Sequence, residues 1–210
     1  MTAGPDFDDG IEARIVAPEA VNPIGSDCDI IDNHWNHRLG QSEKDSGPMD
    51  AASTLCTSCG LCCDGSLFSI APLVPEDGSV VAPLQSYEDG GERYLSLPCP
   101  ALNSERCCTV YGNRPQICSA FRCALLSRLD KRQITLQEAT QKVAVARQHK
   151  LKTLAVVGQF VDTDGRGMRD IKQNYWNLSE EDQTRDIRSY KEGEFLLKVF
   201  GHYLKQYFIK

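Results

Sequence analysis

The final third of the chain carries the clearest helical pattern of apolar positions. Thr135 and Glu138 have the spacing of a capping box, which marks a helix start. Apolar residues then recur every three or four positions, at Leu136, Ala139, Val143 and Ala146. The pattern predicts a long helix that begins near residue 135.

A second helix start lies further along, at Ser179 with Asp182 three residues later. One face of the terminal helix that follows is lined by Leu196, Phe200, Tyr203, Leu204 and Tyr207. Stripes of this kind are usually packing surfaces. We therefore predict a helical C-terminal region over residues 131–210.

Residues 51–130 show only short apolar runs, such as SLFSIAPLV, SVVAPL and RYLSL, which predict brief strands or extended loops. Pro115 suits the first turn of a helix, and PQICSAFRCALLSRL then has helical character. A segment so interrupted has a small core, and small cores commonly recruit metals or cross-links. We expect an irregular, metal-stabilised module here, against which residues 131–210 pack, so that the fold is mainly α with little β.

Residues 1–50 show no sustained period and read as an acidic, mostly disordered arm. They hold eleven Asp/Glu and three Lys/Arg, a balance of −8, whereas the remainder has eighteen and twenty, a balance of +2. Within the arm, DIIDNHWNHRLG is either a short docking motif or, through His34 and His37, an extra metal-binding pair. No strongly basic face stands out, so we expect no nucleic-acid partner.

The sequence shows neither a secretory signal pattern nor an apolar run long enough to span a membrane. We therefore expect a cytoplasmic protein without membrane contact. In that reducing compartment, clustered cysteines bind metal or carry out redox chemistry more often than they form disulfides. Nine of the ten cysteines lie within residues 51–130, so this module is the candidate metal site.

The stretch LCTSCGLCCDG places Cys56, Cys59, Cys62 and Cys63 within eight positions. A C-x2-C-x2-C run supplies three thiolates from one loop and resembles the start of a bacterial ferredoxin motif. The sequence differs from that motif here, because Cys63 directly follows Cys62. Adjacent side chains diverge, so these two cysteines serve either two sites, or one site with a reserve thiol.

Further sulfur follows downstream, where Cys118 and Cys123 fall in the predicted helix. On an ideal helix they would lie about 140° apart and roughly 7.5 Å apart along the axis. They would not easily reach one ion unless that helix begins late or breaks.

The ordered combination C-x2-C-G-x-C-C, Pro-Cys, Cys-Thr-Val-Tyr and Arg-Pro-x-x-Cys-x-x-Phe-x-Cys resembles the YkgJ-type cysteine-cluster family (CxxCxxCC), described as a zinc- or iron-chelating domain. It also resembles the cysteine region of flagellin lysine N-methylases. The resemblance covers residues 55 to 125. The metal ligands it implies are Cys56, Cys59, Cys62, Cys63, Cys99, Cys108, Cys118 and Cys123.

Cys107 lies beside the motif position of Cys108, so the choice between these two stays open, and Cys28 lies outside the motif. Tyr111, Arg114 and Phe121 also fall at motif positions. We expect the two aromatic residues to wall off the site and Arg114 to offset thiolate charge, with Arg93, Arg106 and Arg122 as further cations. The alternative makes Arg114 a substrate anchor.

The sequence thus favours a metal-binding protein that holds an iron–sulfur cluster or zinc and has a redox or accessory role. We lean toward iron–sulfur, because three close cysteines plus remote ones resemble cluster ligation. The resemblance to lysine methylases implies a second hypothesis, an enzyme that modifies protein side chains, with no catalytic residue identified. A third is a zinc-stabilised interaction module that holds a protein partner.

Overall fold

The structure, a computed structural model, describes residues 51–210. The predicted arm, with His34, His37 and Cys28, lies outside these residues. The described part is mainly helical with one small sheet, as the sequence predicted. Its helices are α2 (Ala51–Cys59), α3 (Gln116–Ala120), α4 (Ala124–Asp130), α5 (Leu136–Val157), α6 (Met168–Trp176), α7 (Glu180–Arg185) and α8 (Ile187–Tyr207).

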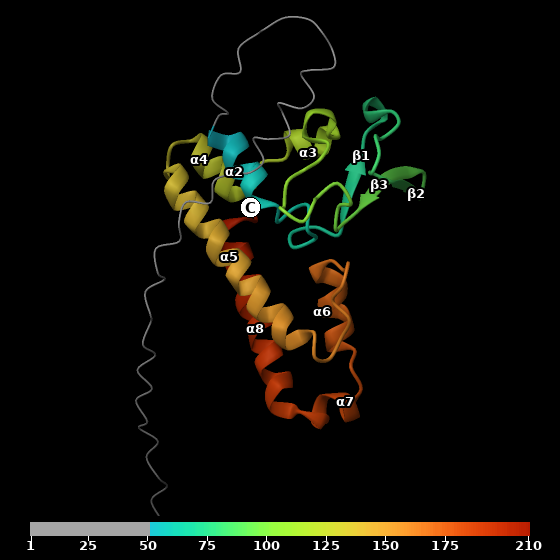
Figure 1. Cartoon of the computed structure of the whole chain (residues 1–210), viewed down its shortest axis with the longest axis vertical. Coiled ribbons are helices and arrows are strands. Elements are labelled where there is room, and N and C mark those ends of the chain that lie inside the picture. Colours follow the sequence, from blue (N-terminus) through green and yellow to red (C-terminus); the bar gives the residue numbers. More distant parts are fainter. Residues whose placement is uncertain (1–50) are drawn as a thin grey trace, which may run out of the picture.

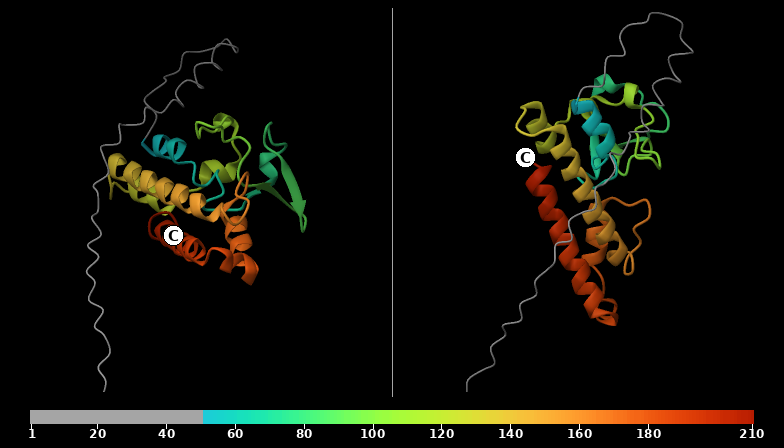
Figure 2. Two further views of the ribbon diagram at one scale, coloured as in Figure 1. Left: turned by 60° about the horizontal axis from the view of Figure 1, so that its bottom comes forward. Right: turned by 60° about the vertical axis from the view of Figure 1, so that its left-hand side comes forward.

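Two long antiparallel helices, α5 and α8, run side by side through the length of the molecule (Figures 1 and 2). The short helices α2, α3 and α4 and the sheet lie at one end of this pair, and α6 and α7 lie toward the other. The backbone amide of Ala124 donates a 3.0 Å hydrogen bond to the carbonyl oxygen of Phe208. The C-terminus is therefore anchored at the start of α4, beside the cysteine-rich end.

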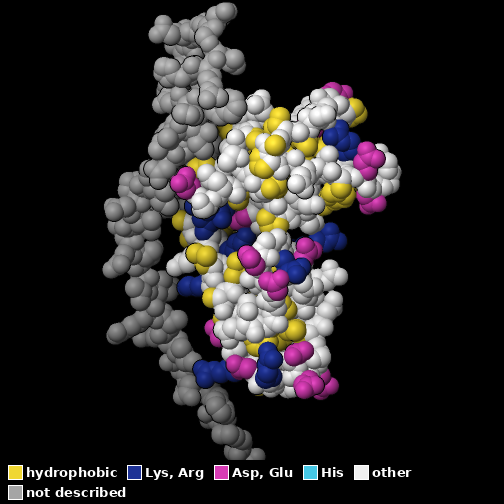
Figure 3. All heavy atoms as spheres, turned by 45° about the vertical axis from the view of Figure 1, so that its right-hand side comes forward, with side chains coloured by type: hydrophobic (Ala, Val, Ile, Leu, Met, Phe, Trp, Pro, Cys, Tyr) yellow, Lys and Arg dark blue, Asp and Glu magenta, His cyan; other side chains and the backbone are white. Residues whose placement is uncertain are grey.

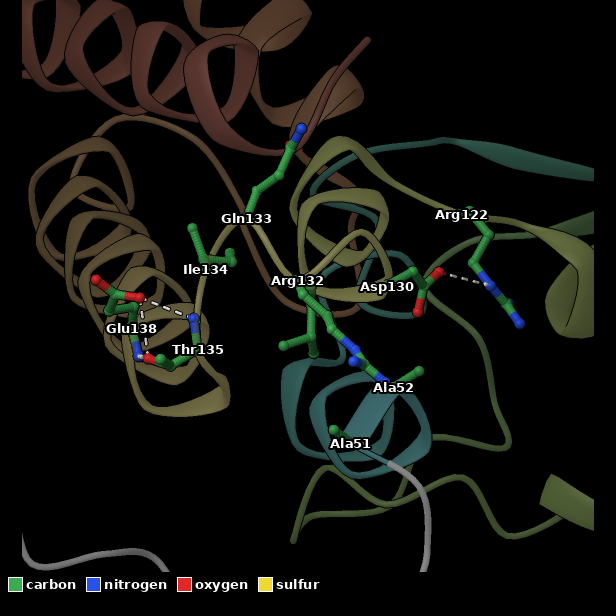
Figure 4. A pocket seen from close by; sticks show the side chains of 10 residues that line it. Ala51, Ala52, Arg122, Asp130, Arg132, Gln133, Ile134, Thr135 and Glu138 are labelled. Atoms are coloured by element: carbon green, nitrogen blue, oxygen red, sulfur yellow. Dashed lines mark hydrogen bonds and ion pairs between the residues drawn. The ribbon is translucent and has the colours of Figure 1, made fainter.

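The predicted capping box at Thr135 is confirmed. The Thr135 hydroxyl accepts a hydrogen bond from the Glu138 amide at 3.2 Å, and the Glu138 carboxylate accepts one from the Thr135 amide at 2.7 Å (Figure 4). The second start is confirmed too, since the Ser179 hydroxyl accepts from the Asp182 amide at 3.2 Å and begins α7. Asp186 then caps the separate terminal helix α8.

One core joins the cysteine-rich end to the C-terminal helices. Its members include Leu55 of α2, Leu61 of the following turn and Leu125 of α4, packed with residues of α5, α6 and α8. Of the stripe predicted on α8, Phe200 and Leu204 are buried, and Tyr203 and Tyr207 pack against the core. None of the helices in the described range is long and apolar enough to cross a membrane.

The sheet has three antiparallel strands in the order β1-β3-β2, formed by β1 (Ile70–Leu73), β2 (Ser86–Asp89) and β3 (Glu92–Ser96). Gly90 and Gly91 join β2 to β3, and both have positive φ, as a tight two-residue hairpin turn requires. Two predicted apolar runs thus contain strands, whereas SVVAPL forms none. A second, smaller core of Leu84, Leu95 and Ala101 lies under this part of the chain.

Candidate metal centre

Cys56 and Cys59 are held by helix α2, where their separation of three residues puts both on one face. The sequence did not predict this helix. It ends at Gly60, whose φ of +66° suits glycine. At Gly60 a Cβ would also lie 3.0 Å from the guanidinium of Arg106.

The chain then turns tightly around the buried side chain of Leu61. The amide of Asp64 donates to the carbonyl oxygen of Gly60 at 2.9 Å, and the amide of Leu67 donates to that of Leu61 at 3.1 Å. Cys62 and Cys63 lie inside this turn. Their positions are therefore fixed by backbone hydrogen bonds and by the apolar anchor between α2 and the turn.

Cys99 is brought to the turn by a 2.7 Å hydrogen bond from its amide to the carbonyl oxygen of Cys63. The loop beyond it folds back on itself, because the Leu102 amide donates to the Cys99 carbonyl at 3.1 Å and Leu102 forms an isolated antiparallel bridge with Cys108. Hydrogen bonds between these loops thus bring together three cysteines that are far apart in the sequence, Cys63, Cys99 and Cys108.

The prediction of one helix from Pro115 is wrong in one respect, because the chain forms two helices with a break between Cys118 and Cys123. Phe121 and Cys123 have extended backbone, with ψ of 131° and 168°, and they separate α3 from α4. Cys123 becomes the N-cap of α4, where its sulfur accepts a hydrogen bond from the Leu126 amide at 3.3 Å. The break frees Cys118 and Cys123 from the spacing of one continuous helix.

Four thiols form what we call the helix-side thiol group: Cys56, Cys59, Cys62 and Cys123. Burial is the main reason that the pKa of the Cys62 thiol is raised, and the thiolates of Cys59, Cys63, Cys123 and Cys56 raise it further. Burial likewise raises the pKa of Cys59 to about 12, with contributions from Cys123 and Cys56. Cys59 and Cys123 also pack against the larger core.

The other four form the sheet-side thiol group: Cys63, Cys99, Cys108 and Cys118. Burial raises the pKa of Cys63 to about 12, and further increases come from Cys99, Cys108, Cys118 and Cys56. Burial raises the pKa of Cys118 to about 11, helped by Cys99 and Cys108. Cys99 packs against the smaller core.

The eight cysteines of these two groups are free thiols, and Cys56 and Cys118 are exposed. Within residues 51–210, however, no three His, Cys, Asp or Glu side chains lie close enough together to hold an ion in this conformation. The donor chemistry fits zinc or iron, because thiolates are soft ligands. The sulfurs are gathered in two neighbouring groups and would have to move inward to close on a metal.

Residues 55–149 match the family model CxxCxxCC, whose description is "putative zinc- or iron-chelating domain". We refer to this matching segment below as the CxxCxxCC domain. It begins on α2, ends within α5 and contains both thiol groups. The match supports a general metal-binding role. No curated protein and no solved structure matches the chain.

Cationic side chains of the CxxCxxCC domain lie beside the helix-side thiol group. Burial raises the pKa of Cys56 even though the residue is partly exposed, while the nearby guanidiniums of Arg114 and Arg122 lower it. Arg147 of α5 donates hydrogen bonds to the carbonyl oxygens of Ser58 and Cys59. Arg114 thus lies where charge compensation was expected.

Arg106 has a different partner from the one the sequence suggested. Its guanidinium lies 2.7 Å from the buried carboxylate of Asp64, which also binds the ammonium of Lys150 at 3.0 Å. Burial alone would raise the pKa of Asp64, but Lys150, the Ser66 amide and Arg106 outweigh it and hold that pKa below its usual value. This buried ionic triad ties the cysteine turn to α5.

Sequence reasoning missed Asp64, because an Asp-Gly pair after a cysteine run reads as an ordinary turn. What distinguishes Asp64 from an ordinary turn residue is the burial of its side chain, which the sequence does not reveal. Cys107 and Cys108, left open by the sequence, differ in exposure. Cys107 is only 3% exposed, and Cys108 is half-buried among the sheet-side thiols. Arg93 lies on β3.

Aromatic side chains make two close contacts within the domain. The guanidinium of Arg114 stacks 3.8 Å over the ring of Tyr111, and Phe121 packs edge-on against Phe68 with ring centroids 5.0 Å apart. In Figure 3, hydrophobic side chains, a class that includes cysteine there, gather on the upper half of the face shown, over the cysteine-rich end.

A hollow of about 730 Å³ lies between the start of α2 and the turn from α4 to α5 (Figure 4). Three of its charged groups already have partners, since Arg122 pairs with Asp130 at 3.5 Å and Glu138 caps α5. We assign no chemistry to it.

Proposed function

We propose that the protein binds iron as an iron–sulfur cluster through the thiolates of its CxxCxxCC domain, and that it has a redox or accessory role. The observation that carries this proposal is the gathering of eight free thiols into two neighbouring groups at one end of the molecule. Thiolates are soft ligands that suit zinc, iron–sulfur clusters and Cu(I), and the family description names zinc and iron.

The make-up of the helix-side thiol group favours a cluster. Cys56, Cys59 and Cys62 supply three ligands from a C-x2-C-x2-C run, and Cys123 is a remote fourth. Bacterial ferredoxins combine three closely spaced cysteines with one distant cysteine in the same way. The cations Arg114 and Arg147 would offset part of the negative charge that such a site carries.

Zinc is the second candidate, because four thiolates also form a closed structural zinc site and the family description names both metals. We also propose a cytoplasmic location, because clustered free thiols are typical of a reducing compartment.

Anaerobic purification followed by metal analysis, acid-labile sulfide analysis and a visible absorption spectrum tests the proposal. We expect a coloured protein that contains iron and sulfide. A colourless protein with stoichiometric zinc would replace the cluster with the second candidate. Purified protein that contains neither metal, and cannot be loaded with either, would reject both.

A further inference from the structure

We infer that the CxxCxxCC domain holds two separate metal centres, one in each thiol group. This inference rests on the proposed function and adds to it the number of centres and the ligands of each. The helix-side centre would use Cys56, Cys59, Cys62 and Cys123. The sheet-side centre would use Cys63, Cys99, Cys108 and Cys118.

Cys62 and Cys63 are adjacent in the sequence, and their side chains diverge. Neighbouring side chains in a chain point apart, so both can hardly bind one ion. In the structure each has its own companions. The carbonyl of Cys63 accepts the amide of Cys99, which places that residue on the sheet side. Cys62 follows Leu61, whose side chain is fully buried in the core that Cys59 and Cys123 also contact.

Each thiol group also has its own scaffold. Helix α2 carries Cys56 and Cys59 and packs against α4, whose N-cap is Cys123, and both helices belong to the larger core. Cys99 packs instead on the smaller core, and α3, which carries Cys118, contacts β1 of the sheet. Two cores therefore hold the two sets of ligands.

The break between α3 and α4 separates one ligand of each group. If the two helices were continuous, Cys118 and Cys123 would have a fixed separation along one axis. The extended residues Phe121 and Cys123 instead let α3 face the sheet while α4 packs on α2. The different packing of these two helices, rather than the break alone, places Cys118 and Cys123 in different ligand sets.

The test is a titration of the reduced, metal-free full-length chain with ¹¹³Cd²⁺, followed by ¹¹³Cd NMR. Cadmium is the probe because it binds thiolate sites and needs no cluster assembly. We expect two resonances of the all-thiolate type and saturation at two equivalents. A single resonance with saturation at one equivalent would overturn the two-centre inference and leave the proposed function intact. Failure to bind any cadmium would instead reject the proposed function.

Two single variants assign the resonances. Cys123→Ser removes a helix-side ligand, and Cys118→Ser removes an exposed sheet-side ligand. We expect each variant to lose or shift a different resonance and to keep the other at its wild-type position. The same resonance changing in both variants would overturn the ligand assignment. If Cys123→Ser does not fold, Cys56→Ser, at an exposed position of the same group, replaces it.

Discussion

The carboxylate of Asp64 and the guanidinium of Arg106 lie 2.7 Å apart, although the two residues are 42 positions apart in the sequence. The same carboxylate binds Lys150 of α5 at 3.0 Å, and its side chain is only 8% exposed. One buried acid therefore joins the cysteine turn, the loop before Cys107 and Cys108, and the long helix. The turn is held in place by this triad even before any metal binds.

Asp64→Asn should lower the free energy of unfolding by about 3 kcal/mol, because it leaves two cations without their buried partner. Asp162→Asn is the matched control, since Asp162 forms an ion pair with Arg166 at the surface and its loss should change little. Denaturant unfolding of both variants measures the difference. An Asp64→Asn protein as stable as the control would contradict the structural role of the triad.

The stability contributed by Asp64 should depend on pH in the acid range. Its pKa is held below the usual value of 3.8, so the ionised form stabilises the folded state above that pH. The difference in unfolding free energy between wild type and Asp64→Asn should therefore stay constant from neutral pH down to about 4, and shrink below it. A difference that grows on acidification would contradict this assignment.

Gly193 of α8 lies against the ring of Tyr175, and a Cβ at this position would be 2.8 Å from the ring carbon that bears the hydroxyl. Tyr175 is fully buried and donates a 2.8 Å hydrogen bond to the carbonyl oxygen of Tyr190. Gly193→Ala should therefore destabilise the protein by about 1 to 3 kcal/mol through overpacking.

Gly201 in the same helix is the matched control, because nothing lies within 4 Å of the added Cβ. Gly201→Ala should stabilise the protein by up to about 1 kcal/mol through helix propensity. Thermal melting should thus move in opposite directions for the two variants. Equal shifts would show that α8 does not pack on Tyr175 as described.

Metal binding should release protons. The thiols of the metal-free domain have raised pKa values, about 12 for Cys59 and Cys63 and about 11 for Cys118, so they carry protons at neutral pH. Each thiolate ligand must lose its proton when the metal binds, and apparent affinity should rise with pH. Titration with zinc in weak buffer should release about four protons per ion if every ligand is a thiol. Release of fewer than about two would contradict thiolate ligation.

The same shifts predict an alkaline effect on the metal-free fold. Because the folded-state pKa values lie above the ordinary value of 9.0, the neutral thiols favour the folded state below about pH 9. This part of the stability should be lost as the pH rises toward 12. Melting temperatures of the metal-free and the metal-loaded protein, compared across this pH range, measure this loss. A metal-free protein whose melting temperature falls no more steeply with pH than that of the loaded protein would contradict the prediction.

The long helices were predictable from the sequence because their signals are local. Thr135 with Glu138, and Ser179 with Asp182, mark helix starts within four residues, and the apolar stripes report which faces are buried. Helix α2 gave no such signal, because it is short and consists mostly of small and polar residues around one buried leucine.

The candidate ligands were also named from the sequence, but their division into groups was not. That division depends on contacts between distant segments, such as the hydrogen bond from Cys99 to Cys63, and on the break at Phe121 that propensity alone does not indicate. Asp64 escaped notice for the same reason, since its partners Arg106 and Lys150 lie far away in the sequence.

X-ray absorption spectroscopy of the anaerobically purified, full-length protein tests metal binding by the cysteine thiolates most directly, because it reports the atoms around the metal. We predict that the nearest neighbours of the metal are sulfur only, at about 2.3 Å for either zinc or iron. Iron in a cluster would add a second shell of iron neighbours. A nearest shell dominated by nitrogen or oxygen would contradict the account, because the two thiol groups would then not be what holds the metal.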